Sequence, residues 1–104
     1  MISKKFRLKK TDIERIYKKG TRKIQHPFLV RTFSNRTNHN RYAVVIPKAI
    51  VAKAVDRNRL RRIIYQFILK ANLQGNTDYI ISLKHKADEA GIDKTLKIIF
   101  AGVK

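Results

Sequence analysis

The chain has no cysteine and few acidic residues, and both absences exclude classes of protein. Without cysteine it can form neither a disulfide framework nor a thiolate zinc site, and it has no cysteine nucleophile. No apolar run approaches the ~18 residues that a membrane-spanning helix needs. The N-terminus is basic but lacks the apolar core of a signal peptide. We therefore expect a cytoplasmic protein with no membrane partner.

Groups that could carry out catalysis are also scarce. Only seven residues are Asp or Glu, and only Asp88 and Glu89 are adjacent, in a predicted loop. A two-metal nuclease needs several carboxylates around ions about 4 Å apart, and the sequence shows no such set. The four glycines are isolated, so there is no glycine-rich phosphate-binding loop. We expect no protein-bound metal or cofactor and no self-sufficient active site.

The three histidines leave two interpretations open. His26, His39 and His85 all fall in predicted loops or at strand edges. Adjacent strands could bring two of them together for acid–base chemistry, for which imidazole is well suited. Solvated loop histidines are the simpler interpretation.

Positive charge is what the chain has in excess. Lys and Arg number 25 against seven acids, which gives a net charge of +18 over 104 residues. Charge repulsion of this size opposes a compact state unless a polyanion neutralises it. Nucleic acid is the favoured partner, because cations that neutralise phosphates release condensed counterions. We predict no obligate protein partner.

Residues 53–69 combine this charge with helical periodicity. Apolar side chains recur at the i, i+3, i+4, i+7, i+8 spacing of an amphipathic helix: Leu60, Ile63, Ile64, Phe67 and Ile68. Arginines with one asparagine cover the opposite side: Arg57, Asn58, Arg59, Arg61 and Arg62. A solvated face would mix charges of both signs, but Asp56 is the lone acid here. Because arginine binds phosphate with a planar fork, we interpret this face as a ligand surface.

Helices and strands alternate along the rest of the chain. Thr11 and Glu14 form a predicted capping box for a helix that ends before Gly20. Strands are predicted at 21–25, 28–33, 42–46 and 78–83, the last of them central because it is nearly all apolar. The polar loop after 28–33 predicts an antiparallel hairpin with 42–46.

Two more helices complete this prediction. The central helix is predicted to end near Asn72, and Asp93 is predicted to cap a last helix whose apolar stripe runs from Leu96 to Val103. The order α-β-β-β-α-β-α defines one small α+β domain over residues 1–104. We expect residues 1–6 to be a flexible basic end.

The segment Arg57–Arg62 resembles the RNR signature of the protein subunit of bacterial ribonuclease P. The resemblance extends over nearly the whole chain, through the opening helix, the strands and the closing helix. It implies the fold of the second domain of a small-subunit ribosomal protein, with a left-handed βαβ crossover at the RNR helix. It also implies a protein that assists a catalytic RNA, which uses Mg²⁺ to remove the 5′ leader from precursor tRNA. The expected partners are therefore ribonuclease P RNA and precursor tRNA.

The resemblance also implies roles for individual residues. Contacts with the catalytic RNA are implied for the RNR residues and two lysines that precede them: Arg57, Asn58, Arg59, Arg61, Arg62, Lys48 and Lys53. Contacts with the precursor leader are implied for residues of the first helix and the second strand: Ile13, Tyr17, Arg31 and Phe33. Ile13 stands where the family often has Phe, and Ala49 where it often has a second Lys. The alternatives are a ribosomal or chaperone-like RNA-binding protein, and a small basic ribonuclease that acts alone.

Overall fold

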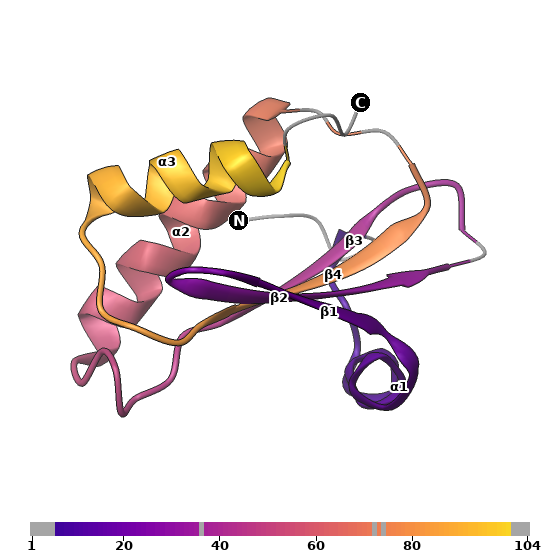
Figure 1. The fold of residues 1–104 in the computed structure, drawn as a ribbon, viewed down its shortest axis with the longest axis horizontal. Coiled ribbons are helices and arrows are strands. Elements are labelled where there is room, and N and C mark those ends of the chain that lie inside the picture. Colours follow the sequence, from indigo (N-terminus) through magenta and orange to yellow (C-terminus); the bar gives the residue numbers. More distant parts are fainter. Residues whose placement is uncertain (1–5, 36, 72, 74, 101–104) are drawn as a thin grey trace.

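The computed structural model describes residues 6–35, 37–71, 73 and 75–100, and within them it confirms the order α-β-β-β-α-β-α. The elements are α1 Lys10–Lys19, β1 Thr21–Gln25, β2 Phe28–Ser34, β3 Arg41–Val45, α2 Ala54–Ala71, β4 Thr77–Leu83 and α3 Glu89–Ile99. Figure 1 shows a twisted sheet with α1 on one face and α2 and α3 on the other. Three predictions concern residues outside this description. They are the flexible end, most of which is residues 1–5, the end of the central helix at Asn72 and the last apolar position of the closing helix at Val103.

The four strands form one sheet in the order β1-β2-β4-β3. β4 is central, as predicted, and it is buried along almost its whole length. The predicted hairpin between the second and third strands is wrong, because β4 lies between them. β2 pairs with β4 antiparallel, and β3 pairs with β4 parallel. An apolar strand buried on both faces needs a neighbour on each side, and this requirement overrides the short loop that suggested a hairpin.

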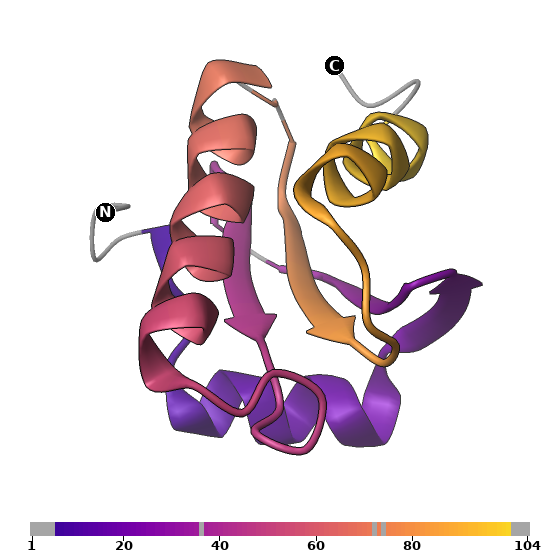
Figure 2. The same ribbon diagram turned by 90° about the vertical axis from the view of Figure 1, so that its left-hand side faces the viewer.

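The parallel pair β3 and β4 is connected through α2, which makes a βαβ crossover. In Figure 2 α2 lies on the viewer's side of the two strands, both arrows point down and β4 is to the right of β3. This arrangement is left-handed, the rare hand for such a connection. The crossover therefore agrees with the one that the family resemblance implied.

The start of α1 differs from the prediction. The helix begins at Lys10, and the backbone N–H of Lys9 donates to Asp12 Oδ2 at 3.3 Å. Thr11 and Glu14 therefore form no capping box, since both lie inside the helix. The end of α1 is as predicted: at Gly20 a Cβ atom would lie 2.7 Å from the carbonyl oxygen of Ile16 and 2.8 Å from that of Thr32. Only glycine allows α1 to sit this close to β2.

The cap of α3 also differs from the prediction. Asp88 caps the helix, and its Oδ1 accepts from the N–H of Gly91 at 2.7 Å. Asp93 lies one turn inside α3, where it pairs with Lys97 at 3.1 Å. Both aspartates suit a cap locally, and the packing of Ile92 in the core fixes the earlier start.

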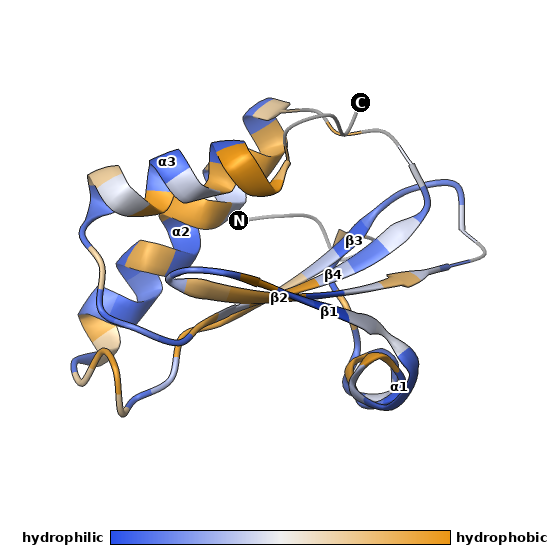
Figure 3. Ribbon diagram, viewed as in Figure 1, coloured by the Kyte–Doolittle hydropathy of each residue, from blue (hydrophilic) through white to orange (hydrophobic). Residues whose placement is uncertain are grey.

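Two apolar layers hold these elements together. The larger lies between the sheet and α2 and α3, and it includes Ile64, Ile68, Ile81 and Leu96. The smaller lies under α1 and consists of Ile16, Ala43 and Ile80 with partly buried neighbours. Figure 3 shows apolar residues concentrated on the sides of the helices that face the sheet. The outer side of α2 and the sheet surface beside α1 are thus left for other contacts.

Candidate nucleic-acid interface

The first arginine of the α2 motif faces its own protein. Arg57 Nη1 donates to the carbonyl oxygens of Val51 at 3.0 Å and Ala52 at 2.8 Å. These bonds hold the segment that leads from β3 into α2. Arg57 therefore fixes the shape of the surface and keeps only part of its guanidinium for a ligand.

The remaining motif residues form the outer surface of α2. Arg61 Nη1 donates to Asn58 Oδ1 at 3.0 Å, so that Asn58 orients a half-buried arginine. Arg59 and Arg62 are exposed. Arg62 forms no ion pair with any other residue in the described part of the chain, whereas Arg59 Nη2 lies 2.6 Å from Glu89 Oε1 of α3. The structure thus brings the predicted arginines together along α2 and gives Arg57, Arg59 and Arg61 different partners within the protein.

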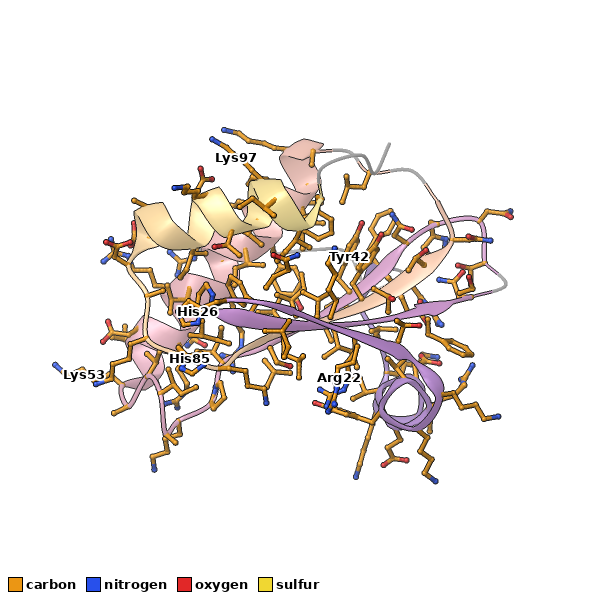
Figure 4. All side chains as sticks on the ribbon, viewed as in Figure 1. Arg22, His26, Tyr42, Lys53, His85 and Lys97 are labelled. Atoms are coloured by element: carbon orange, nitrogen blue, oxygen red, sulfur yellow. The ribbon has the colours of Figure 1, made fainter. Side chains whose placement is uncertain are left out.

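The two lysines implied for the same interface flank this face. Lys48 and Lys53 are both exposed, in the segment between β3 and α2. Lys53 lines a hollow of about 460 Å³ together with Asp56, Arg59, Lys86 and Glu89. Figure 4 shows Lys53 projecting from this end of the molecule. Cations therefore continue from α2 onto the loops that precede α2 and α3.

A second basic surface lies on the opposite face of the sheet, beside α1. The guanidinium carbon of Arg31 lies 4.2 Å from the ring centroid of Tyr17, a cation–π contact between β2 and α1. The Tyr17 side chain is 48% exposed, so its ring is not part of the core. Arg31 Nη1 is buried and has no hydrogen-bond partner among the described residues. Tyr17 and Arg31 thus combine an accessible ring with an unused donor.

Ile13 and Phe33 have a different position from Tyr17. Both are partly buried and pack against the cluster of Ile16, Ala43 and Ile80 under α1. Phe33 also lines a hollow at the N-terminal end of α1. The structure places them next to the predicted leader surface, where both side chains pack under α1.

Arg22 is part of this surface, and no signal in the sequence indicated it. Arg22 on β1 is the direct partner of Arg31 on β2, and partners on adjacent strands project from the same face. Figure 4 shows Arg22 on the side of the sheet that carries α1. The strand pairing that places the two arginines together could not be read from the isolated segment 21–25.

An ion-pair network beside this surface was also missed. Arg41 Nη2 lies 2.8 Å from Asp78 Oδ2, and Arg41 Nη1 lies 3.2 Å from Asp12 Oδ2. The hydrogen bond to Asp78 raises the pKa of Arg41, although burial opposes it. Arg15 also pairs with Asp12 at 2.8 Å. This network ties α1 to β3 and β4, and it depends on the parallel pairing that the predicted hairpin excluded.

Two of the histidines meet. The ring centroids of His26 and His85 are 4.6 Å apart with planes inclined by 32°, whereas His39 contacts Phe6 elsewhere. No group of three or more His, Asp or Glu side chains within the described residues is arranged to hold a metal ion.

No helix in the described part of the chain is both long enough and apolar enough to cross a bilayer.

These features define the class of protein: a small, strongly basic α+β domain with one arginine-rich helix face and a separate aromatic and basic surface on the other side of its sheet. The chain belongs to the Ribonuclease P family, whose sequence profile matches residues 2–103. Family membership therefore rests on almost the whole chain.

Individual relatives agree with this assignment. The chain is 36% identical over 64 residues to the ribonuclease P protein component of Staphylococcus haemolyticus, a match that covers 61% of this chain and 55% of that relative. It is 29% identical over 93 residues to the component of Streptococcus pneumoniae, covering 86% of this chain and 75% of the relative. A solved structure of a Staphylococcus aureus RNase P protein mutant with defective mRNA degradation activity superposes with a TM-score of 0.81 at 28% identity, covering 93% and 86% of the two chains.

Proposed function

We propose that this chain is the protein subunit of a ribonuclease P, which binds the catalytic RNA and the 5′ leader of precursor tRNA and so promotes removal of the leader. The observation that carries the proposal is the placement of two basic surfaces on opposite faces of one sheet, in a chain that belongs to this family. A protein built in this way can contact two RNA segments at once. A ribosomal or chaperone-like protein needs no such pair of surfaces.

The α2 face supports the contact with the catalytic RNA. Arg59 and Arg62 are exposed, and Arg61 is held by Asn58. Arginine forks bind phosphate oxygens in pairs, so successive turns of the helix can follow a folded RNA backbone. Lys48 and Lys53 extend the same contact along the preceding loop.

The surface beside α1 supports the contact with the leader. Arg22 and Arg31 are direct partners across β1 and β2, and like charges in this position repel each other. A phosphate between them removes this repulsion. The half-exposed ring of Tyr17 offers a stacking surface for a base, which is worth about 1–3 kcal/mol in single-strand binding. Together they suit an unpaired strand better than a duplex.

The chemistry of cleavage belongs to the RNA in this proposal. We expect Mg²⁺ to be held by the RNA subunit, whose phosphates are its natural ligands. The role of the protein is to bind and orient its two partners and to reduce their mutual repulsion with its charge of +18. The holoenzyme is expected to act in the cytoplasm.

Reconstitution tests the proposal. The purified chain is mixed with precursor tRNA, with and without a bacterial ribonuclease P RNA, at a Mg²⁺ concentration too low for the RNA alone. Cleavage at the mature 5′ end only when protein and RNA are both present is the expected result. Failure of the protein to stimulate the RNA would favour a general RNA-binding role and contradict the proposal.

A second candidate function is mRNA degradation, an activity that is defective in the similar S. aureus RNase P protein mutant. The same reconstitution tests it with one more arm, in which the chain alone is incubated with a long single-stranded RNA. Degradation that copurifies with the chain through two columns would establish this activity. Intact RNA in that arm, with cleavage of precursor tRNA in the other, leaves only the first function.

A further inference from the structure

The pair His26–His85 lies at the end of the sheet remote from the cation–π pair of Tyr17 and Arg31. His26 follows β1, and His85 lies two residues after β4. Their rings are in contact, with centroids 4.6 Å apart, and both side chains are exposed. Figure 4 shows the two rings close to each other at this end of β2, with Arg22 farther along toward α1.

The backbone holds the two histidines together. Phe28 at the start of β2 is the partner of Leu83 at the end of β4, and the N–H of Lys84 donates to the carbonyl oxygen of Pro27 at 2.8 Å. The hydroxyl of Thr95 on α3 donates to the carbonyl oxygen of His26 at 3.3 Å. Neither histidine therefore depends on the other for its position.

The rings border a hollow of about 250 Å³ whose lining is cationic and apolar: Arg22, Ile24, His26, Phe28, Leu29, Lys84 and His85. Arg22 and Lys84 are the fixed charges in this lining, and no carboxylate belongs to it. The nearest acid along the chain after His85 is Asp88, and its carboxylate caps α3. Arg22 and Lys84 repel a metal cation, whereas an anion would meet these two permanent cations and the two imidazoles.

The contact between the rings excludes one obvious activity. Acid–base cleavage of RNA by two histidines requires an imidazole on each side of the reacting phosphate. Rings in contact leave no room for a phosphate between them. Both imidazoles can therefore contact a phosphate only from the same side. This arrangement suits binding of an anion and does not suit cleavage.

We propose that His26 and His85, with Arg22 and Lys84, form a phosphate-binding site that takes up a proton when an RNA strand occupies it. Imidazole is the side chain whose ordinary pKa places its change of charge between about pH 5 and 8. A bound phosphate favours the protonated ring, so RNA binding and proton uptake are linked. In its assignment of the anion to RNA, the inference rests on the proposed function.

The site continues the surface beside α1. Arg31 and Leu29 alternate along β2 on one face, and their β1 partners are Arg22 and Ile24. At about 3.3 Å per residue, the five residues from Arg31 to Pro27 span roughly 13 Å, the length of about two nucleotides of an extended strand. One RNA strand can therefore contact both Tyr17 and the histidine pair.

A titration of binding against pH tests the inference. The full chain is mixed with a fluorescently labelled decamer of uridine at constant ionic strength, and anisotropy gives the affinity at several pH values. Affinity is expected to rise about three- to tenfold from about pH 8 to about pH 6, because one or two protons are taken up. A second measurement adds inorganic phosphate and follows the imidazole proton resonances of His26 and His85.

Two variants complete the test. His26→Gln with His85→Gln should reduce the change in affinity to less than about twofold over the same range, while His39→Gln should behave as the parent chain. An equal pH dependence in the double variant, or none in the parent, would overturn the inference. The outcome of this titration does not depend on the cleavage assay. Binding of the decamer can be measured even for a chain that does not stimulate the catalytic RNA.

Discussion

Arg59 of α2 and Glu89 of α3 form an ion pair, with 2.6 Å between Nη2 and Oε1. Their side chains are 65% and 49% exposed, so water screens the pair strongly. The third residue of the arginine-rich motif is thus held by an acid before any RNA arrives. An RNA phosphate that binds Arg59 meets this carboxylate beside the guanidinium, and Glu89 consequently competes with the ligand.

Replacing Glu89 by Gln should therefore strengthen binding of the catalytic RNA. Because exposed ion pairs contribute about 0.2–1 kcal/mol, the expected gain in affinity is up to about fivefold. Filter binding of labelled ribonuclease P RNA at fixed salt measures it. Glu14→Gln on α1 is the matched control, because it removes the same charge far from α2; an equal gain in both variants would show a general charge effect.

Arg62 offers the cleanest test of the α2 face, since it is exposed and forms no ion pair with another described residue. Arg62→Ala should weaken binding of the catalytic RNA and lower the slope of log K against log salt by about one for each lost phosphate contact. Lys97→Ala on α3 removes a charge outside the motif and serves as control. Unchanged affinity and slope in Arg62→Ala would assign this arginine to an ordinary solvated surface.

The sequence predicted the α2 face correctly because helical periodicity is a local property. Leu60, Ile64 and Ile68 are buried or partly buried, and Arg59 and Arg62 are exposed, as their spacing required. The arrangement of the strands was not local. Nothing in segments 28–33 or 42–46 states that segment 77–83 inserts between them, so the hairpin prediction failed.

The contacts missed from the sequence all depend on how the strands pair. Arg41 contacts Asp78 only because β3 pairs with β4. His26 contacts His85 only because β2 also pairs with β4. Arg22 joins Arg31 through the pairing of β1 with β2. The sequence left open that two of the histidines meet, but it did not say which two, and it indicated neither arginine contact. The predictions of the helix caps were wrong for a different reason. Several residues near the start of each helix could cap it, and tertiary packing selects one of them.

Tyr17 should affect the leader and not the tRNA body. Tyr17→Ala removes the ring that Arg31 contacts at 4.2 Å, and it should weaken binding of precursor tRNA by the holoenzyme about five- to a hundredfold, the equivalent of one base stack. Mature tRNA, which lacks the leader, should bind as before. Tyr17→Phe keeps the ring and should retain most of the affinity. Equal losses for precursor and mature tRNA would remove Tyr17 from the leader surface.

Arg41 should be essential for stability, because it is the cation that two buried acids share. Asp78 is 1% exposed and accepts from both Arg41 and Asn35, while Asp12 is 7% exposed. Arg41→Met leaves Asp78 charged and without a counter-ion, which should lower the free energy of unfolding by about 3–5 kcal/mol. Urea denaturation followed by circular dichroism measures this loss.

The double variant Arg41→Met with Asp78→Asn decides the cause of that loss. The amide introduced by the second substitution carries no charge, so the penalty of an unpaired buried carboxylate disappears. The double variant should therefore be more stable than Arg41→Met alone by about 1–3 kcal/mol. If the network acted only through packing, the second substitution would add its own cost and stability would fall further. Because the network ties α1 to β3 and β4, the single variant should also lose more affinity for precursor tRNA than for the catalytic RNA, for which we propose the other face.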